Sequence, residues 1–252
     1  MTKIEMPVFV TLTEKGATLA RRLQKTVPGS VVHGRMGRVT DCDQTFDGVI
    51  SHLENLFMEG HQVIGICAAG ILIRALGSHL GSKRTDPAVI SIAENGSSVV
   101  PLLGGHRGAN RMAREFATEL GGHAAITTAG DVSLGFGLDD PPPGWAITDG
   151  TDYKFFSASL LSGTSVNLVT EVGDCDWLMA GNLSLDDTAD LTIRVTDQHT
   201  SLSNTQLVLH PPVLALGVGC ERGCDLDEVY NLVKKTINYA GLSQQSIACV
   251  TS

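Results

Sequence analysis

The sequence has no uninterrupted apolar run near the roughly 18 residues that a membrane-spanning helix needs. It begins MTKIEMPVFVTLTEKG, with one short apolar stretch that soon turns polar, so we expect no signal peptide. We therefore expect a cytoplasmic protein. In that compartment the six cysteines are expected to be reduced thiols.

Basic residues are scarce. The chain carries 18 Lys and Arg against 27 Asp and Glu, a formal net charge of −9. Such a balance argues against nucleic acid or an anionic membrane as partner. The charge is also uneven: residues 131–212 hold twelve acids and two bases, whereas residues 70–130 hold six bases and four acids. The segment 70–130 is thus the locally basic part of an acidic protein.

Motifs for metals and nucleotides are also missing. The sequence has no G-x-x-x-x-G-K-[ST], and its eight histidines show no paired spacing of the metal-binding kind. Cys220-x-x-x-Cys224 has the wrong spacing for most zinc knuckles and no second pair. The loop Gly217-x-Gly219-x-x-x-Gly223 has one residue too many for a dinucleotide loop. We predict no protein-bound metal, and we interpret Cys67 as a buried thiol rather than a nucleophile.

What the first 130 residues do contain is a regular alternation of strand and helix patterns. Apolar runs predict strands at 7–12, 30–33, 61–66, 88–92, 98–103 and 124–127. Helical spacing predicts helices at 13–25, 47–59, 71–80 and 110–120. Asn95-Gly96 predicts a hairpin between two of the strands. The pattern favours an α/β class, with residues 1–130 forming a Rossmann-like domain around a mainly parallel sheet.

Two proline-containing segments divide the rest of the chain, residues 131–252. GLDDPPPGWAITDG, residues 137–150, reads as a linker, and His210-Pro211-Pro212 as a second break. Residues 131–212 predict a small α+β middle domain with one helix and three strands. Residues 213–252 predict a strand, a helix and a strand, the beginning of a third α/β domain. Such a unit cannot bury both faces of a parallel sheet alone, so we expect it to be incomplete or covered by another domain.

The stretch PLLGGHRGAN, residues 101–110, places three glycines, a histidine and an arginine between a predicted strand and a predicted helix. Backbone N–H groups at a helix N-terminus attract anions, and Arg107 and Arg111 can bind a carboxylate or phosphate. His106 can donate a hydrogen bond or transfer a proton near neutral pH. The alternative is a glycine turn that serves only close packing of helix on sheet, with His106 as a cap.

Longer stretches carry a more specific signal. GICAAGILIRALGSHLGSKRTDPAVISIAENGSSVVPLLGGHRGANRMARE resembles the N-terminal domain of the CbiG family of cobalamin biosynthesis. LGFGLDDPPPGW resembles the start of that family's variable middle region, and VLALGVGCERGC the opening of its C-terminal domain. The likeness is collinear from about Val63 to Asn238. It departs from the family at the C-terminus, because family C-terminal domains run well past residue 252.

The resemblance implies a cobalt-precorrin-5A hydrolase. Enzymes of this family open the δ-lactone on ring A of the corrin precursor and release acetaldehyde, giving cobalt-precorrin-5B. It implies no cofactor, since cobalt is carried by the substrate. Two alternatives stay open: a non-catalytic corrinoid-binding accessory or carrier, partnered or fused with a precorrin methyltransferase, and an enzyme acting on phosphorylated metabolites. A homodimer is a further expectation.

The resemblance also directs attention to particular residues. His106 is the first candidate for the base, with Glu94 and Asp86 as alternatives. The N–H groups of Gly105 and Gly108 are candidate oxyanion donors. The residues predicted to contact the carboxylate-rimmed macrocycle are Arg84, Gly104, Gly105, Arg107, Gly108, Asn110, Arg111, Glu221 and Arg222.

Overall fold

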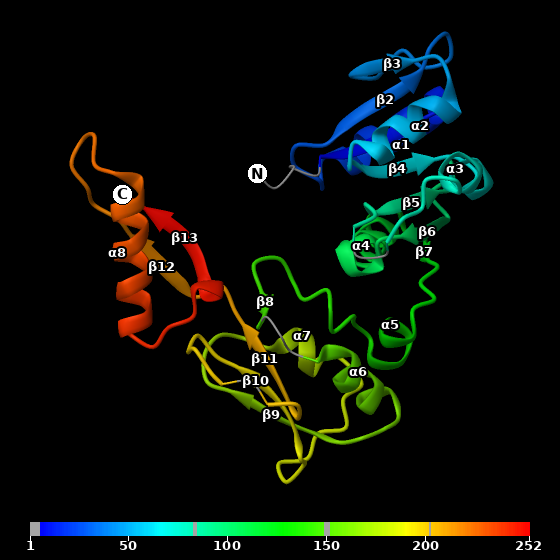
Figure 1. Cartoon of the computed structure of the whole chain (residues 1–252). Coiled ribbons are helices and arrows are strands. Elements are labelled where there is room, and N and C mark those ends of the chain that lie inside the picture. Colours follow the sequence, from blue (N-terminus) through cyan, green and yellow to red (C-terminus); the bar gives the residue numbers. More distant parts are fainter. Residues whose placement is uncertain (1–5, 83–84, 149–151, 202) are drawn as a thin grey trace. The chain divides into compact units, whose positions relative to one another are not determined.

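The computed structural model describes residues 6–82, 85–148, 152–201 and 203–252, and that description leaves out the side chain of His106. The chain divides into two compact units, Met1–Thr128 and Ala129–Ser252 (Figure 1). The finer predicted division of residues 131–252 at residue 212 stays a prediction.

A seven-stranded sheet, in the order β3-β2-β1-β4-β5-β6-β7, forms the centre of the first unit. Neighbouring strands from β3 through β5 run parallel, β6 is antiparallel to β5, and β7 pairs parallel with β6. The strands are β1 (Pro7–Thr11), β2 (Val31–Arg35), β3 (Gln44–Phe46), β4 (Gln62–Ile66), β5 (Val89–Ile92), β6 (Ser98–Leu103) and β7 (His123–Ala124). The predicted α/β class, the mainly parallel sheet and the β5–β6 hairpin are confirmed.

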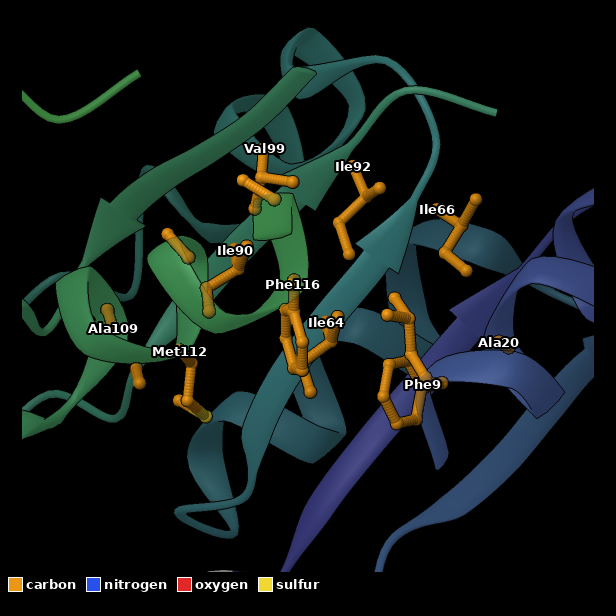
Figure 2. Packing of buried hydrophobic residues seen from close by; sticks show 14 of the residues in the cluster. Phe9, Ala20, Ile64, Ile66, Ile90, Ile92, Val99, Ala109, Met112 and Phe116 are labelled. Carbon is orange, nitrogen blue, oxygen red and sulfur yellow. The ribbon is translucent and has the colours of Figure 1, made fainter. Parts of the chain in front are cut away.

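Helices cover both faces of this sheet because its strands carry apolar residues on both sides. Phe9 of β1 packs in a cluster with α1 and α4, whereas its neighbours Val8 and Val10 pack in a second cluster with α2 and α3. Figure 2 shows the first cluster, where the rings of Phe9 and Phe116 have centroids 6.0 Å apart. The helices are α1 (Glu14–Gln24), α2 (Val49–Met58), α3 (Ala69–Leu76) and α4 (Ala109–Leu120).

Short elements depart from the sequence prediction. β3 was not predicted, and β7 is two residues long where four were expected. Residues 123 and 124 pair with Ser98 and Val99, the first two residues of β6, and the strand goes no further. A 3-10 turn, η1 (Gly105–Arg107), precedes α4. Strand pairing, rather than the local apolar pattern, sets these lengths.

The second unit contains a four-stranded sheet in the order β8-β11-β10-β9. β10 runs parallel to both of its neighbours, and β8 pairs antiparallel with β11. Its core includes Phe156, Leu178 and Ile193, all almost fully buried. The elements are α5 (Ala129–Leu134), β8 (Ala146–Ile147), α6 (Tyr153–Leu161), β9 (Val166–Thr170), α7 (Asp176–Met179), β10 (Leu191–Val195) and β11 (Gln206–His210).

The end of the same unit is a parallel pair of strands with one helix. β12 (Leu214–Gly217) pairs with β13 (Ile247–Thr251), and α8 (Leu226–Tyr239) and η2 (Gln244–Ser246) lie between them in the chain. The helical spacing of the apolar residues in α8 predicts that Val229, Leu232, Val233 and Ile237 point inward. That was wrong for Leu232, which is 63% exposed, while Ile237 is buried. Two strands offer too narrow a face to cover a whole helix side.

Among the residues that the structure describes, no helix has both the length and the apolar character required to cross a membrane.

Candidate functional site

A pocket of about 610 Å³ lies in the first unit, where β1, β4 and β5 end. β1 and β4 are neighbours in the sheet although β2 and β3 come between them in the chain. α1 packs on one face of the sheet and α3 on the other, so the loops that follow β1 and β4 diverge. In doubly wound α/β proteins this switch point, at the carboxyl ends of the strands, is the usual place for a ligand.

Thr13 and Glu94 form the polar centre of this pocket. Thr13 follows β1, and its hydroxyl accepts a hydrogen bond from the N–H of Gly16 at 3.1 Å, which caps α1. The same hydroxyl donates to Oε1 of Glu94 at 2.6 Å. Glu94 follows β5 and is partly buried. Because the cap fixes Thr13, the hydrogen bond also fixes the carboxylate at the mouth of the pocket.

Cys67, directly after β4, lines the same pocket but is poorly suited to be a nucleophile. Burial, with a further contribution from the charge of Glu94, raises the pKa of its thiol to about 11. The thiolate is the reactive form, so almost none of it is present near neutral pH. The backbone carbonyl of Cys67 accepts a hydrogen bond from Ser91 at 2.9 Å, which ties β4 to β5. The prediction of a buried packing thiol is confirmed.

The N-terminus of α3 supplies hydrogen-bond donors to the pocket. Its N-cap is Ala68, which has no side-chain hydrogen bond to offer, and its first turn contains no acidic residue. Ala68 and Ala69 both line the pocket. The first N–H groups of a helix have no acceptor within the helix and carry a partial positive charge. Arg38, an exposed residue, adds a guanidinium to the rim.

The glycine loop lies at the opposite end of the strands from the pocket. β6 runs antiparallel to β5, and Leu103 at its end pairs with Val89 at the beginning of β5. Glu94 and Gly104 are therefore separated by the length of β6, which for six residues is about 20 Å. Gly104 has φ 73°, and a Cβ there would lie 2.6 Å from the Cα of Ala88. A glycine is required at this position for backbone packing.

Several of the predicted site residues around this loop make hydrogen bonds or ion pairs within the protein. Arg107 donates from Nη1 to the carbonyl of Thr85 at 2.7 Å, and Asn110 donates to the hydroxyl of Thr128 at 2.8 Å. Arg111 lies 3.8 Å from the carboxylate of Glu115, one helical turn further on. These contacts join the loop, the start of α4 and the segment before β5.

Asp86 lies at this same end of the strands, just before β5. Its carboxylate accepts hydrogen bonds from the N–H groups of Gly81 and Ser82, at 3.1 Å and 3.2 Å for the shorter contact with each. That arrangement organises the turn after α3. Of Asp86 and Glu94, the two carboxylates considered as bases, only Glu94 lines the pocket at the switch point.

The structure thus divides the predicted site. Glu94 lies where β5 ends. The other described candidates of the first unit lie at the opposite end of the strands, where β5 begins: Asp86, Gly104, Gly105, Arg107, Gly108, Asn110 and Arg111. Glu221 and Arg222 are exposed residues of the second unit, between β12 and α8. Arg84 and the side chain of His106 lie outside the described residues. Their roles stay predictions.

Sequence reasoning missed most of the pocket. Leu12, Thr13 and Arg38 were not proposed as site residues, and neither were the small residues that follow Cys67. One signal could have found them: each predicted strand of a parallel sheet delivers its next residues to the same edge. Within the described part of the chain, no group of three or more His, Cys, Asp or Glu side chains is placed to hold a metal ion.

The first unit is therefore a doubly wound α/β domain with a mainly apolar pocket at its switch point, and Thr13 and Glu94 form the polar centre of that pocket. Residues 51–131 match the family model for Cobalamin synthesis G N-terminal. The predicted resemblance to the CbiG family is confirmed, and it extends over nearly the whole chain.

Two curated relatives carry that likeness beyond the matched segment. The cobalt-precorrin-5A hydrolase of Priestia megaterium is 28% identical over 266 residues, covering 94% of this chain and 71% of that protein. The cobalt-precorrin-5A hydrolase of Salmonella typhimurium is 27% identical over 272 residues, covering 99% and 76%. The crystal structure of a cobalamin biosynthesis protein G homolog from Sulfolobus solfataricus matches 98% of this chain and 73% of its own, at 18% identity and a TM-score of 0.48.

Proposed function

We propose that this chain is a cobalt-precorrin-5A hydrolase that acts in cobalamin biosynthesis. The observation that carries the proposal is that two curated proteins of that name match 94% and 99% of the chain. The pocket at the switch point supports it, because a hydrolase needs a carboxylate or imidazole base beside donors for a developing negative charge.

The reaction expected from the family begins at the δ-lactone on ring A. The oxygen of a water molecule bonds to the lactone carbonyl carbon, the water passes a proton to a base, and negative charge develops on the carbonyl oxygen. Collapse of this intermediate breaks the ring C–O bond and leaves a carboxylate and an alcohol. The hydroxyl of the extruded two-carbon unit then loses its proton, and the C–C bond to the macrocycle breaks. The unit leaves as acetaldehyde, and the macrocycle keeps the electron pair and takes up a proton. The protein must therefore provide a base, an oxyanion site and room for one edge of the macrocycle.

Glu94 is the base that we propose. Its carboxylate lines the pocket and is held by the Thr13 hydroxyl at 2.6 Å. We assign the oxyanion site to the N-terminus of α3, where the N–H of Ala69 is the first donor and Ala69 itself lines the pocket. The open pocket admits the lactone edge of the substrate, and Arg38 at the rim is a partner for a peripheral carboxylate.

The glycine loop is the competing location. There His106 would be the base, and the N–H groups of Gly105 and Gly108 would stabilise the oxyanion. Against this location stands the geometry of Gly104, whose conformation is explained by close packing on Ala88. Arg107 also donates to the carbonyl of Thr85, a contact that a purely structural loop would make. We therefore interpret the loop first as a packing turn.

The surroundings of the reaction remain proposals as well. We propose that the protein works in the cytoplasm without a cofactor of its own, because the cobalt ion arrives within the substrate. A precorrin methyltransferase that makes the substrate or uses the product is the expected partner, and a homodimer is the expected assembly.

The experiment is acetaldehyde release from cobalt-precorrin-5A by the purified chain, with the absorbance of the corrinoid followed in parallel. The hydrolase proposal expects acetaldehyde in a one-to-one ratio with the lactone consumed. A carrier would bind the corrinoid and shift its absorbance without producing acetaldehyde. An enzyme for phosphorylated metabolites would leave the corrinoid spectrum unchanged and bind nucleotides instead. Either of the last two results overturns the proposal.

A further inference from the structure

Two cysteines lie four residues apart in the segment that joins β12 to α8. Cys220 is exposed and Cys224 is partly buried, and both are free thiols. The segment is anchored at both ends. Before it, the N–H of Val218 donates to the carbonyl of Thr251 at 2.8 Å, which continues the pairing of β12 with β13. After it, Asp225 caps α8 by accepting from the N–H of Asp227 at 2.9 Å.

The backbone between the anchors turns back on itself. The N–H of Cys224 donates to the carbonyl of Glu221 at 3.2 Å, and Gly223 has φ 88°, in the left-handed region. The Cys220 thiol is the first cause of the raised pKa of Cys224, ahead of burial. Because the backbone reverses within these few residues, the two cysteines lie at the two ends of one short turn, and a disulfide can span such a turn when the Cα atoms come within about 7 Å of each other.

We propose that Cys220 and Cys224 are a redox-active pair that forms a reversible disulfide by exchange with a small-molecule disulfide such as oxidised glutathione. The Cys220 thiolate attacks one glutathione sulfur, and one glutathione leaves as a thiolate that takes up a proton. The Cys224 thiolate then attacks the sulfur of Cys220, and the second glutathione leaves. Two protein thiols are oxidised to one disulfide, and one glutathione disulfide is reduced to two thiols.

Exposure decides the order of these steps. A small disulfide reaches Cys220 first because Cys220 is the exposed member of the pair, and Cys224 resolves the mixed disulfide. Cys249 of β13 is also exposed and serves as a matched control, since it lies outside the turn. Excess reduced glutathione reverses the exchange. The proposal therefore agrees with the expectation that the cysteines are normally reduced.

The location gives the pair a consequence. Glu221 and Arg222, two residues predicted to contact the substrate, lie between the two cysteines. A disulfide closes a small ring around them and restricts the backbone that carries them. This consequence rests on the proposed function, whereas formation of the disulfide does not.

Trypsin offers a direct test because it cleaves after Arg222, between the two cysteines. Cleavage at Arg194, Arg222 and Lys234 puts Cys220 alone in the peptide 195–222 and Cys224 alone in the peptide 223–234. The full chain is equilibrated with oxidised glutathione, alkylated in denaturant and digested without reduction. We expect the loss of two alkylatable thiols from the total of six, and the two peptides joined to each other. Dithiothreitol should separate them.

Variants make the result specific. Cys249→Ser should still lose two thiols, and Cys224→Ser should instead accumulate a glutathione adduct on Cys220. The proposal is overturned if the wild type retains all its thiols over the whole range of glutathione ratios. It is equally overturned if the linked peptides contain Cys249, or if Cys220 joins Cys220 of a second molecule. None of these results depends on hydrolase activity, so a failed hydrolase assay leaves them interpretable.

Discussion

Gly104 occupies a position that no other residue fits without rearrangement. Its φ of 73° lies in the left-handed region, and a Cβ would meet backbone atoms of Ala88, at 2.6 Å from Cα and 2.9 Å from N. Gly121, at the end of α4, also has a positive φ, 65°, but no atom lies within 4 Å of its Cβ position. Substituting alanine at Gly121 therefore tests backbone strain alone, whereas the same substitution at Gly104 tests strain together with steric overlap.

We predict that Gly104→Ala lowers the free energy of unfolding by roughly 2–4 kcal/mol, the sum of a left-handed conformation and an overpacked contact. Gly121→Ala should lose only about 1–2 kcal/mol, since it carries the conformational part alone. Urea denaturation of both variants beside the wild type measures the difference. Equal losses in the two variants would show that the contact with Ala88 carries no energy.

The buried His33 of β2 and the partly buried His52 of α2 form a pair. Nδ1 of His33 lies 2.9 Å from Nε2 of His52, and the His52 ring stacks on Phe46 with centroids 4.3 Å apart. Burial lowers the pKa of His33 to about 4, helped by the two nearby histidines His52 and His61 and opposed by Asp43. Burial also lowers the pKa of His52, against the charge of Glu59.

This pair makes stability depend on pH in a definite direction. The folded protein keeps His33 neutral, whereas the unfolded chain binds a proton below a pKa of about 6.5. Stability is therefore full above that pH and falls as the pH drops toward about 4. Between pH 7.5 and 5, we expect His33 to account for a loss of about 2 kcal/mol.

Urea denaturation at these two pH values measures the loss. His33→Asn should reduce the dependence on pH, whereas His123→Asn, at an exposed position of β7, should retain it. If the free energy of unfolding of His33→Asn changed with pH as much as that of the wild type, the assignment of this titration to His33 and His52 would be contradicted.

Helix α1 depends on its N-cap residue, Thr13. The Thr13 hydroxyl accepts from the N–H of Gly16 and donates to Glu94, so it both begins the helix and positions a pocket residue. We predict that Thr13→Ala destabilises the first unit by about 1 kcal/mol, the usual effect of losing an N-cap side chain. Thr13→Ser keeps the hydroxyl and should stay close to the wild type. Thermal or urea unfolding of the two variants measures this difference. If Thr13→Ala and Thr13→Ser were equally stable, the hydroxyl of the N-cap would contribute nothing to stability.

Most elements could be predicted because their signals are local. The N-cap Thr13, the apolar stripe of α1 and the run Val166–Thr170 each specify an element without reference to the remainder of the chain. β3 and β8 have no such signal, since three and two residues form strands only where a neighbouring strand pairs with them. The exposure of Leu232 likewise depends on how much sheet lies beneath α8, which helical spacing does not show.

The division of the site follows from the direction of one strand. The hairpin signal Asn95-Gly96 was read from the sequence, and a hairpin by itself sends the residues after β6 back to the edge where β5 begins. Glu94, within the hairpin connection, and Asp86, before β5, therefore belong to different ends of the sheet. The candidates could be predicted from the sequence. Their grouping could not, because the pocket also needs β1 beside β4, a pairing between strands distant in the chain.

We propose that hydrolysis takes place at the switch-point pocket, with Glu94 as the base. The most direct test is the turnover number for acetaldehyde release by Glu94→Gln, compared with His106→Ala and Asp86→Asn, after each variant is shown to be folded and to bind cobalt-precorrin-5A. We predict that Glu94→Gln loses about 10²–10⁴-fold in turnover while binding is maintained, the range for a general base. His106→Ala and Asp86→Asn should lose far less. A Glu94→Gln enzyme with wild-type turnover, beside an inactive His106→Ala enzyme, would contradict the claim and place the reaction at the glycine loop.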